Sequence, residues 1–114
     1  MKGDSKVIEY LQEVLKAELT AINQYFLHAK MMQDWGYLRL GAHTRAESID
    51  EMHHAEEIIE RILYFDGVPN VARLSPMRIG EDVPEQFRSD LDLEYAAVER
   101  LNRAVAKAVP KADR

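Results

Sequence analysis

The chain has 114 residues, of which 46% are hydrophobic, and its formal net charge is -5. This length suffices for one compact domain and is too short for two, so we expect residues 1–114 to form a single domain. The sequence contains no cysteine, which excludes disulfides, zinc-thiolate sites and iron–sulfur clusters. Any metal must therefore be held by oxygen and nitrogen. The acidic charge, without a basic stripe, argues against nucleic acid as a partner.

The start of the chain, Met1 to Lys6, leads into an amphipathic pattern and not into the apolar core of a signal sequence. No apolar run approaches the length of a transmembrane helix. These features predict a cytoplasmic protein that does not insert into a membrane.

Apolar residues recur at helical spacing in three segments, which predicts helices at about 5–33, 37–65 and 84–109. Asp4 is placed to cap the first helix, and Gly67 is placed to terminate the second. Each helix carries an apolar stripe on one face, so the expected fold class is all-α.

The segment between the second and third predicted helices, about 66–83, has no helical period and is rich in proline and glycine. An extended chain advances about 3.3 Å per residue, whereas a helix advances about 1.5 Å. This segment can therefore travel the whole length of a helix. We expect it to be a long crossover that leaves the third helix parallel to the second.

Two acids interrupt the apolar stripes. Glu18 lies three residues after Leu15 on the first predicted helix, and Glu94 lies three residues after Leu91 on the third. A single acid of this kind is usually a surface residue at the edge of the stripe. Two such positions on separate helices favour a shared polar site inside the bundle.

The second predicted helix carries the densest set of candidate metal ligands. Glu47 and Glu51 are four residues apart and Glu51 and His54 are three apart, so all three side chains share one helix face. The same face continues to Ile58 and is otherwise apolar. Burial of unpaired carboxylates is costly, and a bound cation is the usual remedy.

Carboxylate-bridged di-iron sites in helical bundles use one Glu from each of two helices and a Glu-x-x-His from each of the other two. The chain supplies the single residues Glu18 and Glu94 and one Glu-x-x-His, formed by Glu51 and His54. The sequence contains no second copy of that motif. We interpret these four residues as metal ligands.

Several segments of the chain resemble the bacterioferritin family. They are Met1 to Asp4, Ala21 to His28, Asp34 to Gly36, Glu47 to Met52, Arg61 to Leu63, Gly67, Pro69 with Asn70, and Ile79 to Glu81. The resemblance implies a ferritin-like four-helix bundle with a long crossover between the second and third helices, of which this chain holds only the first three. It also implies a homo-oligomer, a 24-subunit shell built from twofold dimers.

The activity implied by the resemblance is that of a ferroxidase, which oxidises Fe(II) to Fe(III) with oxygen or peroxide and stores the ferric mineral. An iron-release ferredoxin is an implied partner. By resemblance, the ligands of a di-iron centre are Glu18, Glu51, His54 and Glu94, with Glu51 bridging the two irons. Tyr25 matches a tyrosine beside that centre. Glu47 and Asp50 match acids near metal positions on the inner surface of the shell.

Met52 lies about 100° round the helix from Glu51, so it points away from the metal face. From the residues alone, it is a polarisable filler at a helix–helix interface. By resemblance, it binds haem b together with the same residue of a second subunit across a twofold axis.

The resemblance ends at about residue 109, and the family's fourth helix, with the second Glu-x-x-His, is not in this sequence. A shortened protein, a fragment cut after the third helix and the ordered part of a longer chain all remain open as explanations. Two further functions stay open beside the ferroxidase: a haem-binding helical dimer module without ferroxidase activity, and a plain structural bundle.

Overall fold

The computed structural model describes residues 3–108, which form three long helices without a strand. The helices are α1 (Ser5–Asp34), α2 (Leu38–Tyr64) and α3 (Val83–Ala108). Their bounds agree with the predicted ones to within one residue. The predicted end of the third helix at residue 109 lies outside the described residues.

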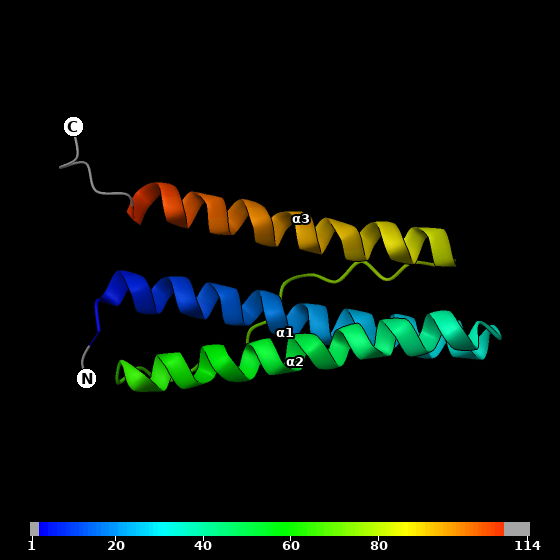
Figure 1. Ribbon diagram of the computed structural model, residues 1–114, viewed down its shortest axis with the longest axis horizontal. Coiled ribbons are helices and arrows are strands. Elements are labelled where there is room, and N and C mark those ends of the chain that lie inside the picture. The colour runs from blue at the N-terminus through cyan, green and yellow to red at the C-terminus, as the bar shows by residue number, and fades with distance from the viewer. Residues whose placement is uncertain (1–2, 109–114) are drawn as a thin grey trace.

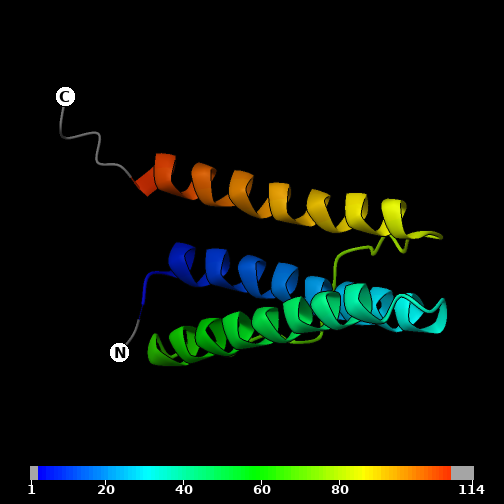
Figure 2. The ribbon, with the colours of Figure 1, turned by 45° about the vertical axis from the view of Figure 1, so that its right-hand side comes forward.

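The three helices lie side by side, with α1 in contact with both of the others (Figure 1). Helices α2 and α3 run in the same direction, opposite to α1 (Figures 1 and 2), as the long crossover predicts. Helix α1 packs on α2 along most of its length and on α3 through a smaller interface. Within residues 3–108, α2 and α3 do not approach each other closely.

Local hydrogen bonds define the start of α1 and the end of α2. The Asp4 carboxylate accepts from the backbone N–H of Lys6 at 2.7 Å and so caps α1. At the end of α2, Asp66 and not Gly67 takes the left-handed conformation, with φ of 61°. The prediction that Gly67 terminates the helix by its conformation is therefore wrong. A Cβ atom at Gly67 would lie 2.9 Å from Ile62 Cγ2, so glycine is needed there for close approach.

Helix α3 begins at Val83 and is capped by a residue that the sequence pattern did not single out. The Asp82 carboxylate accepts from the backbone N–H of Glu85 at 2.8 Å. Pro84 lies in the first turn, where its missing N–H leaves no helical hydrogen bond unmade.

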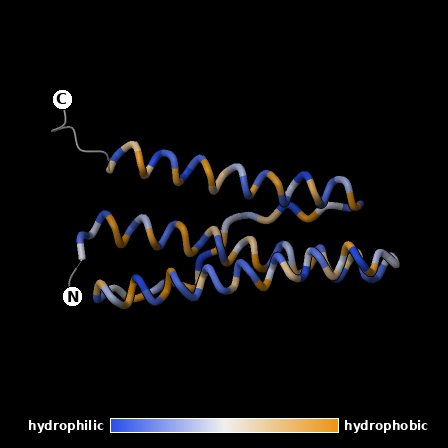
Figure 3. The backbone as a smooth tube through the Cα atoms, viewed as in Figure 1, coloured by the Kyte–Doolittle hydropathy of each residue, from blue (hydrophilic) through white to orange (hydrophobic). Residues whose placement is uncertain are grey.

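The apolar core lies between α1 and α2. It is built on Leu15, Ala55 and Ile62, against which Leu11, Leu19, Ile22, Ile58 and Ile59 pack. The predicted stripe of α3 is visible in Figure 3 as a repeating series of apolar positions. Its members are 38–56% exposed: Phe87, Leu91, Val98, Leu101 and Val105. No helix within residues 3–108 is both long enough and apolar enough to cross a membrane.

The crossover between α2 and α3 is held by polar side chains of α1. Thr20 Oγ1 accepts from the N–H of Ser75 at 2.9 Å. Further along α1, Gln24 and His28 accept from backbone N–H groups at positions 78 and 80. These hydrogen bonds satisfy the backbone of a segment that has no strand partner.

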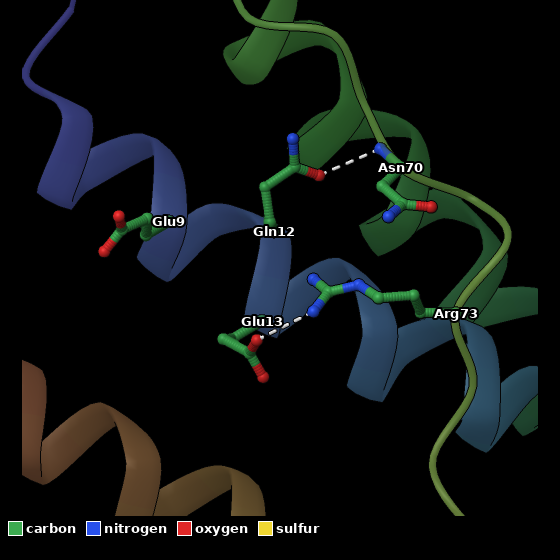
Figure 4. A pocket seen from close by; sticks show the side chains of 5 residues that line it. All are labelled: Glu9, Gln12, Glu13, Asn70 and Arg73. Atoms are coloured by element: carbon green, nitrogen blue, oxygen red, sulfur yellow. Dashed lines mark hydrogen bonds and ion pairs between the residues drawn. The ribbon is translucent and has the colours of Figure 1, made fainter.

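Gln12 anchors the first part of the crossover (Figure 4). Its Oε1 accepts from the N–H of Asn70 at 2.9 Å, and its Nε2 donates to the carbonyl of Val68 at 2.8 Å. Beside it, Arg73 forms an ion pair with Glu13 at 3.2 Å. The crossover is thus bound to α1 at both of its ends.

Replacing Gln12 by Ala should lower the free energy of unfolding by about 1–3 kcal/mol, because two hydrogen bonds to backbone groups are lost and each contributes about 0.5–1.5 kcal/mol. Urea denaturation followed by circular dichroism measures the change. Glu9→Ala, one turn away on the exposed surface, is the control and should be neutral. Equal stability of the two variants would contradict the anchoring role.

Candidate metal centre

Glu18 of α1 and Glu51 and His54 of α2 converge across the helix pair. One ligand atom from each lies within 4.8 Å of the other two. His54 Nδ1 is 3.4 Å from Glu51 Oε2 and 3.9 Å from Glu18 Oε2. The packing of α1 on α2 around Leu15 and Ala55 fixes the two backbones that carry these side chains.

The two carboxylates are mostly buried and incompletely satisfied. The side chains of Glu18 and Glu51 are 19% and 15% exposed, whereas that of His54 is 57% exposed. Glu18 Oε2 is buried without a hydrogen-bond partner. Burial raises the pKa of Glu51 above the ordinary carboxyl range; a hydrogen bond from His54 opposes this rise, and repulsion by Glu94 adds to it. A divalent cation would neutralise the two carboxylates and bind the lone pairs of Glu18 Oε2, which accept no hydrogen bond from the described residues.

Glu94 of α3 joins the same site from the third helix. The fully buried Tyr25 donates its hydroxyl proton to Glu94 Oε1 at 2.5 Å. Burial, together with the hydrogen bond to Glu94, raises the pKa of Tyr25, so the phenol stays protonated and remains a donor. Both residues line a cavity of about 360 Å³ with Glu18, Glu51 and His54. Glu94 is outside the tight group of three.

Two predicted metal positions, Glu47 and Asp50, lie outside this group as well. Glu47 Oε1 pairs with His43 Nε2 at 3.3 Å. Burial raises the pKa of Glu47, the His43 contact lowers it, and nearby acids including Asp50 raise it further. Met52, predicted to bind haem, is 52% exposed and does not line the metal cavity.

Three polar residues near the cavity escaped the sequence analysis. Asp90 Oδ1 accepts from Gln24 Nε2 at 2.8 Å and from His28 Nδ1 at 2.9 Å. His28 is fully buried. The only sequence signal for Asp90 is its position one helical turn before Glu94.

Three long helices, an extended crossover between parallel helices and a site of carboxylates and histidine define a ferritin-like bundle. The family profile described as a ferritin-like domain matches residues 8–114. The chain is 53% identical over 113 residues to the bacterioferritin of Mycobacterium bovis, covering 99% of this chain and 71% of that protein. It is 53% identical over 105 residues to the bacterioferritin of Streptomyces coelicolor, covering 92% of this chain and 63% of that protein.

Among solved structures, Mycobacterium tuberculosis bacterioferritin, BfrA, superposes with a TM-score of 0.92 at 54% identity. That alignment covers 95% of this chain and 68% of the other. The chain belongs to the bacterioferritin family. Its general role is iron storage.

Replacing Glu51 by Gln should stabilise the metal-free protein at neutral pH, because the amide avoids the cost of burying a charge. The pKa of Glu51 is raised in the folded state, so the carboxylate destabilises the fold above that raised value. The advantage of the variant should shrink as the pH falls toward the ordinary value of 4.5. A tenfold difference in proton affinity between the folded and unfolded states corresponds to about 1.4 kcal/mol.

Urea denaturation with a chelator present, at several pH values between neutral and acid, measures this difference. Glu56→Gln is the matched control, because that side chain is 70% exposed on the same helix. A Glu51→Gln variant that is no more stable than wild type at any of these pH values would show that the carboxylate is well solvated.

Proposed function

We propose that this chain is a ferroxidase subunit, which oxidises Fe(II) to Fe(III) with oxygen or peroxide and passes the ferric product to a stored mineral. The observation that carries the proposal is the buried Glu18 Oε2, which has no hydrogen-bond partner within residues 3–108, beside Glu51 and His54. Carboxylate oxygens and imidazole nitrogen are a donor set that suits iron. The substrate iron supplies the electron that the oxidant takes.

The residues around the cavity have different proposed roles. Glu18 and Glu51 offer negative charge in a mostly buried place, which favours the more highly charged ferric ion. His54 is more than half exposed and gives access from solvent. Tyr25 holds Glu94 Oε1 by its hydroxyl proton and leaves the other oxygen for a second iron position. Glu47 and Asp50 are proposed as holding points for iron near this site.

The two iron positions are unequal within this chain. Glu18, Glu51 and His54 are grouped together, whereas Glu94 stands apart with Tyr25. We propose that a further helix, from another chain or from a longer parent protein, covers the exposed stripe of α3 and brings a second Glu and His. At about 25 cal/mol per Å², burial of a helix-long groove of several hundred Å² corresponds to on the order of 10 kcal/mol.

Haem b is the second proposed cofactor. Met52 offers a thioether, a recognised axial ligand of haem iron, on a half-exposed part of α2 away from the cavity. Its position is compatible with an equivalent Met52 from a second copy. The same observation supports the alternative function, a haem-binding dimer without ferroxidase activity.

Family membership supports the rest of the proposal. The assembly is a homo-oligomeric shell of 24 subunits built from twofold dimers, in the cytoplasm, and a ferredoxin supplies electrons for iron release. Ferroxidase activity is expected in full only where the second Glu and His complete the site.

Replacing Glu18 by Ala should slow Fe(II) oxidation under air at least about tenfold, because the loss of groups that merely orient metal ligands already costs about 10- to 100-fold. The appearance of ferric absorbance measures the rate. Glu56→Ala, an exposed acid on α2, should leave the rate unchanged. Equal rates for wild type and Glu18→Ala would refute the ferroxidase assignment and leave the haem-binding alternative.

Replacing Met52 by Leu should abolish most haem binding while keeping the fold, since Leu has a similar volume and lacks the sulfur ligand. The Soret absorbance per chain measures haem content after reconstitution. Met77→Leu, in the crossover, is the control for methionine replacement as such. Unchanged haem content in Met52→Leu would rule out this ligand.

A further inference from the structure

The position of α3 relative to the metal cavity depends on a small number of polar contacts. Its interface with α1 is limited, and within residues 3–108 it does not approach α2 closely. The hydrogen bonds described between oxygen and nitrogen atoms of α1 and α3 all end on Asp90 or Glu94. The amide of the buried Gln86 on α3 also donates to Met31 Sδ of α1 at 3.5 Å, a weaker hydrogen bond to sulfur. Asp90 and Glu94 therefore make the oxygen and nitrogen contacts that hold α3 against α1.

Asp90 makes the more buried of the two connections. Its Oδ1 accepts from Gln24 Nε2 at 2.8 Å and from His28 Nδ1 at 2.9 Å. Gln24 and His28 are 1% and 0% exposed, and the side chain of Asp90 is 14% exposed. Without Asp90, both buried donors would lose their protein acceptor, and leaving a buried donor unsatisfied destabilises the folded state.

The other ends of Gln24 and His28 are bound to the crossover. His28 Nε2 accepts from the N–H of Gly80 at 3.0 Å, so the ring proton lies on Nδ1 and is donated to Asp90. Gln24 Oε1 accepts from the N–H of Arg78 at 3.1 Å, which leaves its Nε2 as the donor to Asp90. Both donors are therefore held in fixed orientations before they meet α3.

Glu94 follows Asp90 by four residues, so the two lie on one face of α3, and their Cβ atoms are about 5–6 Å apart. Tyr25, which binds Glu94, is the neighbour of Gln24 on α1. We propose that Asp90 is a positioning residue. Its hydrogen bonds to Gln24 and His28 fix the position of α3 along α1, and in that position Glu94 contacts Tyr25 and faces the metal cavity. The part of this proposal that concerns iron rests on the proposed function.

A double-mutant cycle between Tyr25 and Glu94 tests the proposal without metal. In the wild-type background, the melting-temperature shifts of Tyr25→Phe and Glu94→Ala should not add, because the two residues share one hydrogen bond. In an Asp90→Ala background the shifts should add, because α3 no longer holds Glu94 at Tyr25. In an Asp90→Asn background the coupling should return, since the Asn Oδ1 accepts from the same two donors.

Ser89→Ala is the matched control, because Ser89 is buried on α3 and its hydroxyl donates to the carbonyl of Gln86 on its own helix. This variant should keep the coupling. Persistent coupling in Asp90→Ala, additive shifts in Asp90→Asn or additive shifts in the wild type would each overturn the proposal. If Asp90→Ala does not fold, Gln24→Met replaces it: weakened coupling supports the proposal, and unchanged coupling overturns it.

Co(II) binding, followed by visible absorption and with all ligands of the cavity intact, connects the proposal to the metal site. Asp90→Ala should weaken binding at the Glu94 position about 10- to 100-fold and leave binding at the Glu18, Glu51 and His54 group unchanged. Equal affinities in Asp90→Ala and wild type would overturn the positioning of a metal ligand. If wild type binds no Co(II), the proposed function fails, and the stability cycle still decides the role of Asp90.

Discussion

The burial of two carboxylates in the seam between α1 and α2 is the constraint on which the rest of the structure depends. Glu18 and Glu51 face each other where a bundle would ordinarily place hydrocarbon, and Glu18 Oε2 has no hydrogen-bond partner within residues 3–108. Such an arrangement opposes folding of the metal-free protein. The close packing around Leu15 and Ala55 compensates for that cost and keeps the ligands in place.

Helix α1 organises the molecule because its faces serve different purposes. One face packs on α2 and carries Glu18, and a second presents polar side chains that bind the backbone of the crossover. Tyr25 and its neighbours meet α3. The crossover follows α1 from one end toward the other (Figure 1). Because it returns the chain to the end at which α2 began, it has to be long, and α3 runs parallel to α2.

The sequence predicted the helices well, because the bounds of α1 to α3 follow the helical period. Glu18, Glu51 and His54 lie close together in the structure, and their binding of metal stays a prediction. The anchors of the crossover could not be predicted in this way, since the segment they bind has no period of its own. His28 and Asp90 were missed because a polar residue on a helix is ordinarily exposed, and only tertiary contact buries these two.

The amphipathic pattern predicted the apolar face of α3, but such a pattern does not show what covers that face. In residues 3–108, α1 contacts α3 only in part, and Leu91, Val98 and Val105 remain about half exposed. The iron chemistry proposed for the chain depends on the group of Glu18, Glu51 and His54, and on Glu94, which lies outside that group.

The most direct test of the central claim is a crystal structure of the protein loaded anaerobically with Fe(II), with anomalous differences collected on both sides of the iron absorption edge. Our account predicts an iron peak within bonding distance of Glu18, Glu51 and His54, with a weaker peak at Glu94. A fully loaded crystal without iron at the Glu18, Glu51 and His54 group would contradict it.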